Sequence, residues 1–223
     1  IRLIRTAGST SAARERMIID PATTPRPELY AFMIRCIAPR PIAWVSTISR
    51  EGKTNLAPYS FFNGVSSNPP ALLFVASRHD DGKKKDTLVN VEETRQFVVN
   101  VVPESLAEQM NITATEYPHG MSEFEKAGLT PAPSDRVAPP RLKESPVNFE
   151  CELHDTLQVG EGGAGSGTIV VGRIVLIHVD ESILRNGKID YELYHPVGRM
   201  GGMEYSRTRD RFTLVRKKYV PES

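Results

Sequence analysis

Residues 39–62 read PRPIAWVSTISREGKTNLAPYSFF, and this stretch decides the fold. Apolar and β-branched residues fill two short runs, 41–49 and 55–62, on either side of a polar turn, so we predict two antiparallel strands. Pro58 has no backbone N–H and interrupts the pairing near that point. Small and hydroxyl-bearing residues at the open end leave backbone groups accessible to a flat polar ligand. The alternative is an ordinary hairpin with an edge proline, and the pattern alone leaves both readings open.

Four further apolar runs predict strands over residues 71–77, 96–102, 148–159 and 167–180. The last run is nearly continuous in Val, Ile and Leu, whereas a strand with one wet face alternates apolar and polar residues. We therefore expect 167–180 to be covered on both faces, by a barrel interior on one side and by a helix or a second subunit on the other. The predicted fold is mainly β, a β-barrel with a few peripheral helices.

Three short helices are predicted, over residues 86–95, 103–110 and 122–127. Asp86 or Thr87 is expected to cap the first helix, and Pro103 suits the first turn of the second. Ser122 and Glu125 have the spacing of a capping box at the start of the third. The proline-rich residues that follow, 130–147, are expected to form an extended loop.

The charge of the 223-residue chain is nearly balanced, with 28 Lys and Arg against 27 Asp and Glu and a net charge of +1. A general nucleic-acid binder needs a basic excess or a basic stripe, so nucleic acid is not an expected partner. No apolar run reaches the roughly 18–20 residues of a membrane helix, so no membrane association is expected. Cys36 and Cys151 are too few for a disulfide framework and indicate reduced thiols in a cytoplasmic protein.

A single domain is predicted over residues 17–223, preceded by an extension of residues 1–16. The extension is rich in Arg, Ser and Ala and has no acid before Glu15. This composition is typical of a transit peptide and equally of translated upstream sequence, and it lacks the apolar core of a secretory signal. We expect the extension to contribute nothing to the functional site.

The segment GEGGAG at 160–165 matches the G-x-G-x-x-G pattern of dinucleotide-binding loops. That motif needs a helix directly after the glycines, because the helix N-terminus holds the pyrophosphate. A strand-like segment, SGTIVV, follows here. We therefore interpret 160–165 as the loop of a β-hairpin.

The histidines show no metal-binding spacing, and the chain carries no nucleophile motif, so no metal site is expected. His178 lies within an apolar strand and is interpreted as a core histidine with a hydrogen-bond partner. A chain with few reactive side chains is typical of proteins in which a cofactor supplies the chemistry.

A phosphate site is predicted where Ser77 and Arg78 end one strand and Lys85, Asp86 and Thr87 open a helix. Hydroxyls, cations and unpaired helix N–H groups are the groups that bind phosphate. Lys83 and Lys84 fit a solvated loop equally well.

The segments PRPIAWVST, NLAPYSFFN, the Ser77–Thr87 spacing that ends in KDT, and QFVVNVV closely resemble the flavin reductase-like family of FMN-binding split barrels, which is associated with flavoprotein oxygenases. EFEKAGL and YHPVGRMGGMEY are also similar to this family, and the resemblance runs from about Met17 to the end of the chain. It implies a Greek-key split β-barrel that forms homodimers, with FMN at or near the subunit interface.

The resemblance also implies the residues that contact FMN. They are Trp44, Ser46 and Thr47 from the first strand; Asn55, Ala57, Pro58, Tyr59, Ser60 and Phe61 along the isoalloxazine edge; and Ser77, Arg78, Lys85, Asp86 and Thr87 around the phosphate. An ionised Asp86 is expected to cap the helix or orient Lys85. Arg199, Gly201 and Tyr205 are implied near the flavin or the substrate, and His195 near a nicotinamide, with His195 and Arg199 as the catalytic candidates.

The function implied is hydride transfer from NADH or NADPH to FMN, with release of reduced flavin to a partner oxygenase as the family's behaviour. Two alternatives stay open. One is an enzyme that keeps its FMN and acts on its own organic substrate, with residues 117–140 as a lid. The other is an FMN-binding electron-transfer protein without a nicotinamide site, because no separate nicotinamide motif is present.

Overall fold

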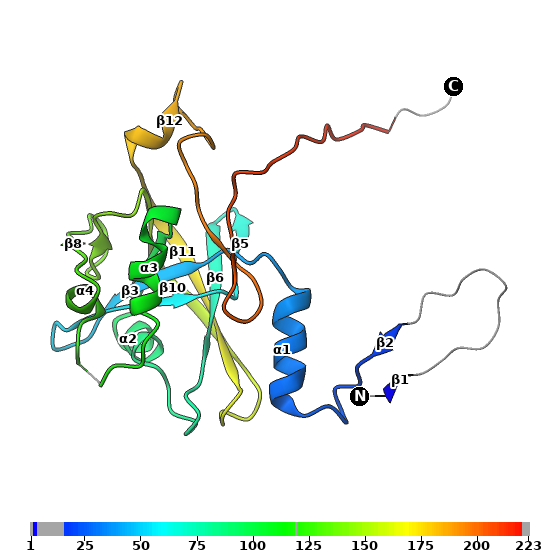
Figure 1. The fold of residues 1–223 in the computed structure, drawn as a ribbon. Coiled ribbons are helices and arrows are strands. Elements are labelled where there is room, and N and C mark those ends of the chain that lie inside the picture. Colours follow the sequence, from blue (N-terminus) through cyan, green and yellow to red (C-terminus); the bar gives the residue numbers. More distant parts are fainter. Residues whose placement is uncertain (1, 4–15, 119, 220–223) are drawn as a thin grey trace.

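The computed structural model describes residues 2–3, 16–118 and 120–219, and its centre is a seven-stranded antiparallel sheet (Figure 1). The strand order is β4-β3-β7-β10-β11-β6-β5. These strands are β3 (Ala43–Ile48), β4 (Thr54–Tyr59), β5 (Phe62–Ser67), β6 (Pro70–Ser77), β7 (Gln96–Val101), β10 (Val147–Val159) and β11 (Gly167–Val179). The mainly β fold predicted from the sequence is confirmed.

Short two-residue strands form four further pairs outside the main sheet. They are β1 (Arg2–Leu3) with β2 (Met17–Ile18), β8 (Pro131–Ala132) with β9 (Arg141–Leu142), β12 (Leu184–Arg185) with β13 (Lys188–Ile189), and β14 (Gly198–Arg199) with β15 (Tyr205–Ser206). Most of the 1–16 extension lies outside the described residues.

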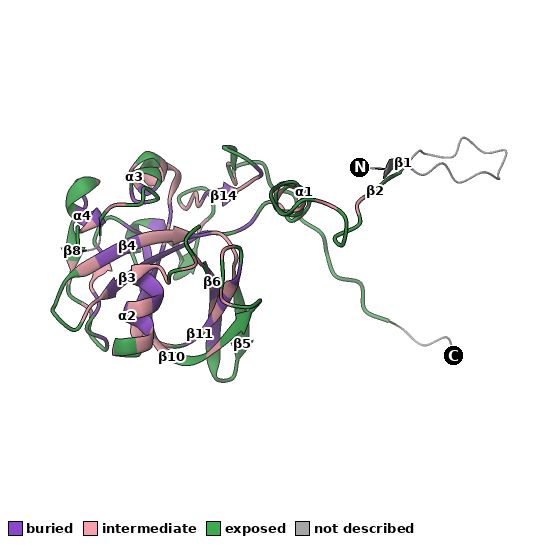
Figure 2. Cartoon of the chain, turned by 90° about the horizontal axis from the view of Figure 1, so that it is seen from below, coloured by how far each residue is buried: buried purple, intermediate pink, exposed green. Residues whose placement is uncertain are grey.

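The described helices are short and lie around the barrel (Figures 1 and 2). They are α1 (Arg26–Cys36), α2 (Asp86–Thr94), α3 (Ala107–Ile112) and α4 (Glu123–Lys126), with 3-10 turns η1 (Glu104–Leu106) and η2 (Glu181–Ile183). Within the described residues, no helix combines the length and the apolar character that crossing a membrane requires.

The sheet curls until its edge strand β4 contacts β6, but no ladder joins the two edge strands β4 and β5. This unpaired seam makes the barrel a split one. The predicted strand 55–62 is therefore wrong in one respect, because the chain leaves β4 after Tyr59 and starts β5 at Phe62. Pro58 is tolerated opposite Trp44 because β4 is an edge strand and its outer side needs no donor.

Strand β3 separates two hydrophobic clusters. Ala43 and Val45 point into the barrel, where they pack with Phe74, Phe97 and other residues of the inner cluster. Ile42 and Trp44 belong to the opposite cluster, which is completed by residues of α3, α4 and the following loops, including Met110, Phe124 and Leu142. Both faces of β3 are thus buried, and the second cluster fixes α3 and α4 against the barrel.

Strand β11 is only partly covered within the chain. Its first half alternates between buried and partly exposed residues, and every residue from Arg173 to Val179 is partly or fully exposed. Ile177 is 49% exposed. The chain by itself therefore covers only one face of β11, and the cover expected on the other face, a helix or a second subunit, stays a prediction.

The 160–165 loop connects β10 and β11, which pair antiparallel from Val159–Gly167 back to Val147–Val179. The interpretation of GEGGAG as a hairpin loop is confirmed. Gly160, Gly162 and Gly165 have positive φ, which explains the glycines by backbone geometry alone.

The N-caps of two helices differ from those predicted. Lys85 occupies the N-cap position of α2, so neither Asp86 nor Thr87 does. Ser122 is the N-cap residue of α4 but makes no capping hydrogen bond; its hydroxyl lies 2.9 Å from that of Thr54 instead. The predicted capping box is absent, and Gly128 just after α4 has a positive φ, which is common at helix ends.

Helix α1 was not predicted. Pro27 in its first turn, Glu28 near its start and Arg35 near its end are signals that could have located it. Figure 2 shows α1 beside the barrel, and none of its residues is buried. Residues 207–211 still contact the body through Glu104, Pro196 and Glu192, and residues 212–219 are exposed.

Candidate functional site

A cavity of about 640 Å³ lies between β4, the start of α2 and the chain after α3. We call it the large cavity. Its walls contain five of the residues predicted around FMN besides Lys85 and Asp86, namely Asn55, Ala57, Pro58, Tyr59 and Thr87. The remaining walls come from residues 79–84, 113–117 and Glu123.

Two smaller cavities meet the large one at Pro58, which lines all three. The first, of about 150 Å³, is lined by Tyr59, Ser60, Phe61, Ser77 and Lys85 among others, and we call it the small cavity. The second, of about 230 Å³, contains Arg40 and Arg199, and we call it the arginine cavity. The end of β4 and the turn after it thus contribute to the walls of three neighbouring spaces.

Lysine side chains on the wall of the large cavity are each held by a carboxylate. Lys83 lies 2.7 Å from Asp81, and Lys84 lies 2.5 Å from Glu92. Lys85 has a looser partner, because its Nζ lies 3.5 Å from the exposed Glu116. Lys85 is therefore the cation of this wall that an incoming anion reaches with the least competition.

Glu116 also contacts His79, whose Nδ1 lies 3.0 Å from its Oε1. Burial favours the neutral carboxyl group, but the charges of Lys85 and His79 outweigh it and hold the pKa of Glu116 below its usual value. Glu116 is thus an anion at the mouth of the cavity.

Glu123 is a site residue that the sequence analysis missed. It is 8% exposed, lines the large cavity and accepts a hydrogen bond from the Leu56 N–H at 2.9 Å. Burial and the nearby charge of Asp86 raise the pKa of Glu123. The position of Glu123 three residues before Lys126 in EFEKAGL gave no chemical signal for this role.

Tyr59 and Thr87 are buried residues in the wall of the large cavity. Burial raises the pKa of Tyr59, and the Thr87 hydroxyl opposes this rise, although no hydrogen bond of good geometry joins the two groups. Thr87 Oγ1 accepts a hydrogen bond from Asn55 Nδ2 at 2.8 Å. A buried Tyr59 hydroxyl without such a bond is a donor that a polar ligand satisfies.

Three predicted FMN contacts lie elsewhere. Trp44, Ser46 and Thr47 are completely buried and line none of the three cavities. Trp44 Nε1 donates to Thr113 Oγ1 at 2.8 Å, Ser46 Oγ donates to the Pro140 carbonyl at 2.6 Å, and Asn90 Nδ2 donates to Thr47 Oγ1 at 3.0 Å. Their side chains are occupied in packing because both faces of β3 are covered.

Arg78 turns away from the large cavity but keeps an unused donor. Its Nη2 donates to Gln158 at 3.0 Å, while its Nε is buried and has no hydrogen-bond partner among the described residues. A buried guanidinium nitrogen without a partner is a position where an anion fits.

The four predicted site residues between 195 and 205 lie in different places. Arg199 and Tyr205 line the arginine cavity, with the guanidinium 4.5 Å from the ring centre of Tyr205. Gly201 lies against Arg35 of α1, and His195 lines none of the three cavities. His195 Nδ1 is buried and unpartnered within the described part of the chain.

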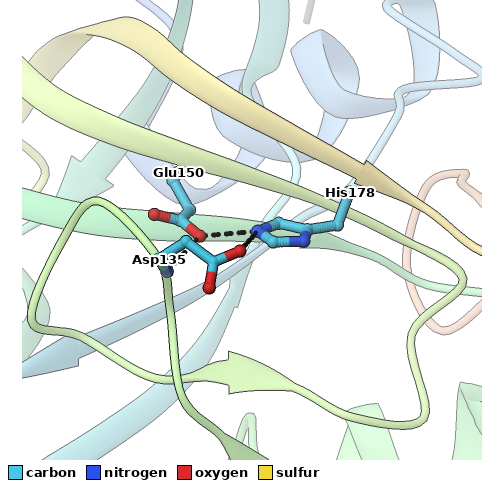
Figure 3. A group of neighbouring side chains, drawn as sticks. All are labelled: Asp135, Glu150 and His178. Carbon is cyan, nitrogen blue, oxygen red and sulfur yellow. Dashed lines mark hydrogen bonds and ion pairs between the residues drawn. The ribbon is translucent and has the colours of Figure 1, made fainter.

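A cluster outside these cavities joins Asp135, Glu150 and His178 (Figure 3). Their ligand atoms lie within 4.8 Å of one another, the kind of spacing that metal sites have. The buried Glu150 carboxylate, however, accepts backbone N–H groups from the loop residues Asp135, Arg136 and Val137, and its Oε1 lies 2.6 Å from His178 Nε2. The cluster therefore anchors the proline-rich loop, and His178 has the partner that the sequence analysis expected.

Comparison with known proteins agrees with this architecture. The sequence family described as "Flavin reductase like domain" matches residues 34–202. A flavin reductase with split barrel domain from Shewanella frigidimarina shares the fold, with a TM-score of 0.71 at 24% identity over 89% of this chain and 96% of that one. The fold is thus that of the split-barrel flavin reductases.

Two solved structures are closer in sequence. Nitrilotriacetate monooxygenase component B from Bacillus cereus is 34% identical, with a TM-score of 0.85 over 89% of this chain and 98% of that one. Pseudomonas fluorescens 2-nitrobenzoate 2-nitroreductase is 31% identical, with a TM-score of 0.81 over 92% and 99%. The chain belongs to the flavin reductase-like family and is a flavin-related oxidoreductase.

Proposed function

We propose that this protein binds FMN across the large and small cavities and reduces it with NADH or NADPH. The observation that carries the proposal is the shared lining at Pro58, Tyr59 and Ser60, where a cavity with lysines in its walls lies next to two smaller ones. A flat ring system with a phosphate tail fits a cavity that combines apolar contacts, a few polar groups and cations for the phosphate.

The phosphate end of the proposed site is formed by Lys85, Ser77 and the start of α2. Lys85 lines both the large and the small cavity, and Ser77 lines the small one. The N-terminus of the nine-residue helix α2 adds partial positive charge at the same wall. The unpartnered Arg78 Nε supports a role for Arg78 as a further phosphate contact.

FMN, when bound, supplies the hydride acceptor and passes the electrons onward. The residues of this chain bind and orient it. Tyr59 Oη is available as a donor, backbone groups of residues 57–61 follow the ring edge, and Glu123 adds an acid with a raised pKa to the same cavity. Preorganised donors near the ring stabilise the charge that reduction creates.

A partner oxygenase is part of the proposal, since one similar structure is a monooxygenase component B. A second candidate, an enzyme that retains FMN and acts on its own organic substrate, is favoured by the separate arginine cavity and by the similarity to a nitroreductase. Retention of FMN through turnover distinguishes the two.

We further propose a homodimer in the cytoplasm. Large apolar residues are exposed on α1 and on the β10–β11 ribbon, among them Tyr30, Ile37, Leu157 and Ile177. Burying such residues against a second copy removes apolar surface from water, at roughly 25 cal/mol per Å². Both cysteines are unpaired, as in a reducing compartment.

The test is a visible absorption spectrum of the purified chain with added FMN, followed by anaerobic NADH and then NADPH. Flavin bands that bleach with either nucleotide support the proposal and identify the donor. Bands that persist with both nucleotides contradict the reductase activity, and a protein that takes up no FMN contradicts the site. Ultrafiltration after turnover then separates released flavin from retained flavin.

A further inference from the structure

The arginine cavity has an unusual charge. Its walls come from α1, the end of β4, α3 and the β14–β15 pair, and they contain two arginines and no carboxylate. The remaining walls are apolar or neutral, including Ile34, Ile42 and Met110. The cavity therefore combines positive charge with apolar walls.

Arg40 is 5% exposed, and its hydrogen-bond partners among the described residues are neutral. Its Nη1 donates to the carbonyls of Ile34 and Ile37, its Nη2 to the carbonyl of Met200 at 2.9 Å, and its Nε weakly to Ser60 at 3.4 Å. No ion pair joins Arg40 to a carboxylate within the described part of the chain. The guanidinium is positioned, but its charge is not neutralised.

Arg199 stands beside it. The backbones pair in both directions, with Arg40 N to Arg199 O at 2.9 Å and Arg199 N to Arg40 O at 2.8 Å. Desolvation lowers the pKa of Arg40, and the charge of Arg199 lowers it further against the opposing effect of Tyr30. Two cations are thus held close together, and their repulsion raises the free energy of the empty cavity. A bound anion removes this repulsion.

Arg199 keeps the donors that such an anion needs. Its Nη2 donates to the Gly202 carbonyl at 2.5 Å, and its guanidinium lies over the Tyr205 ring. Its Nε and Nη1 make no hydrogen bond to a described residue. A guanidinium with free donors binds a carboxylate through two parallel hydrogen bonds.

The size and floor of the cavity define the rest of the ligand. At about 230 Å³ it is smaller than the roughly 300–1,000 Å³ of sites for drug-sized molecules, so it takes one ring rather than a dinucleotide. Ile34, Ile42, Pro58 and the rings of Tyr30 and Tyr205 supply apolar and aromatic contacts.

We propose that the arginine cavity binds a small aromatic carboxylate, with its carboxylate on Arg199 in the field of Arg40 and its ring against Pro58. Because Pro58 and Ser60 also line the cavities assigned to FMN, the ligand then lies beside the flavin; this last point rests on the proposed function.

The test is calorimetric titration of the full chain with benzoate and with benzamide, its neutral counterpart, each with and without FMN. We expect benzoate to bind at least about tenfold more tightly than benzamide. Arg199→Gln is expected to remove this preference. The matched control Arg173→Gln, at an exposed ion pair on β11, is expected to keep the preference.

Equal binding of benzoate and benzamide, or no binding of either, overturns the inference, and so does a preference that Arg199→Gln leaves intact. If Arg199→Gln fails to fold, the comparison of the two ligands on the unmodified chain decides. Binding of NADH that Arg199→Gln abolishes, with no binding of benzoate, assigns the arginines to the nucleotide and also overturns the inference. Absence of FMN binding contradicts the proposed function alone, because the titration without FMN still tests the cavity.

Discussion

Lys85 Nζ lies 3.5 Å from the carboxylate of Glu116, and this pair stands at the wall where the phosphate of FMN is proposed to bind. An exposed carboxylate in this position occupies the cation that the phosphate needs. Glu116 and a bound phosphate therefore compete for Lys85.

Replacing Glu116 by Gln is expected to tighten FMN binding by up to about fivefold, the range that exposed ion pairs give. Titration of flavin fluorescence measures the change. The control Glu181→Gln, at an exposed turn, is expected to leave the affinity unchanged. Weaker FMN binding in Glu116→Gln would show that Glu116 helps to hold the flavin.

Lys85→Ala is expected to weaken FMN binding by about 10- to 100-fold, because a charge-assisted hydrogen bond contributes roughly 1.5–3 kcal/mol. Lys84→Ala is the matched control, since Lys84 is already paired with Glu92 at 2.5 Å. Equal effects of the two substitutions in the same titration would contradict the assignment of Lys85 to the phosphate.

Glu150→Gln tests the loop anchor of Figure 3. Burial alone favours the neutral acid, but hydrogen bonds from the Asp135 N–H, His178 and the Arg136 N–H together hold the pKa of Glu150 below its usual value of 4.5. A lowered pKa in the folded state means that ionised Glu150 stabilises the fold above about pH 4.5, and that this contribution is lost as the pH falls through the folded-state pKa.

The Gln variant is therefore expected to unfold more easily at pH 7, by about 1–3 kcal/mol, and to approach the unmodified protein at pH 3. Urea unfolding at both pH values measures this. Glu152→Gln, at an exposed pair with Arg173 on the same strand, is expected to change stability by less than about 1 kcal/mol. A pH-independent difference for Glu150→Gln would exclude the ionised anchor.

The hairpin loop offers two neighbouring glycines with opposite expectations. Gly162 has φ of +86°, whereas Gly163 has open space around an added Cβ and no positive φ. Gly162→Ala is expected to cost about 1–2 kcal/mol of stability, and Gly163→Ala close to nothing. Thermal unfolding measures both, and FMN affinity is expected to stay unchanged. If either variant lost FMN binding at unchanged stability, the loop would bind the nucleotide after all.

The strands and the hairpin loop could be predicted because each depends on local sequence. Apolar runs bounded by turn residues locate β6, β7, β10 and β11 within a residue or two. Gly160, Gly162 and Gly165 are followed by a β-branched run, which favours a hairpin and excludes a helix start.

The burial of Ser46 and Thr47 could not be predicted, because it depends on what covers β3. Hydroxyls in a strand are typical of a wet face, yet here Pro140 and Asn90 arrive from distant segments and satisfy them. The same limit applies to Glu123 and Arg40, whose neighbours Leu56 and Met200 are far away in the sequence. Packing between distant segments decides each of these cases.

Trp44 is the only tryptophan of the chain, and its indole is completely buried with Nε1 on Thr113, a residue of the large cavity wall. Its ultraviolet emission therefore comes from a single dry environment one hydrogen bond away from the cavity. Any flavin held there lies close enough to quench that emission by energy transfer. The protein thus carries a built-in optical reporter of occupancy that needs no label.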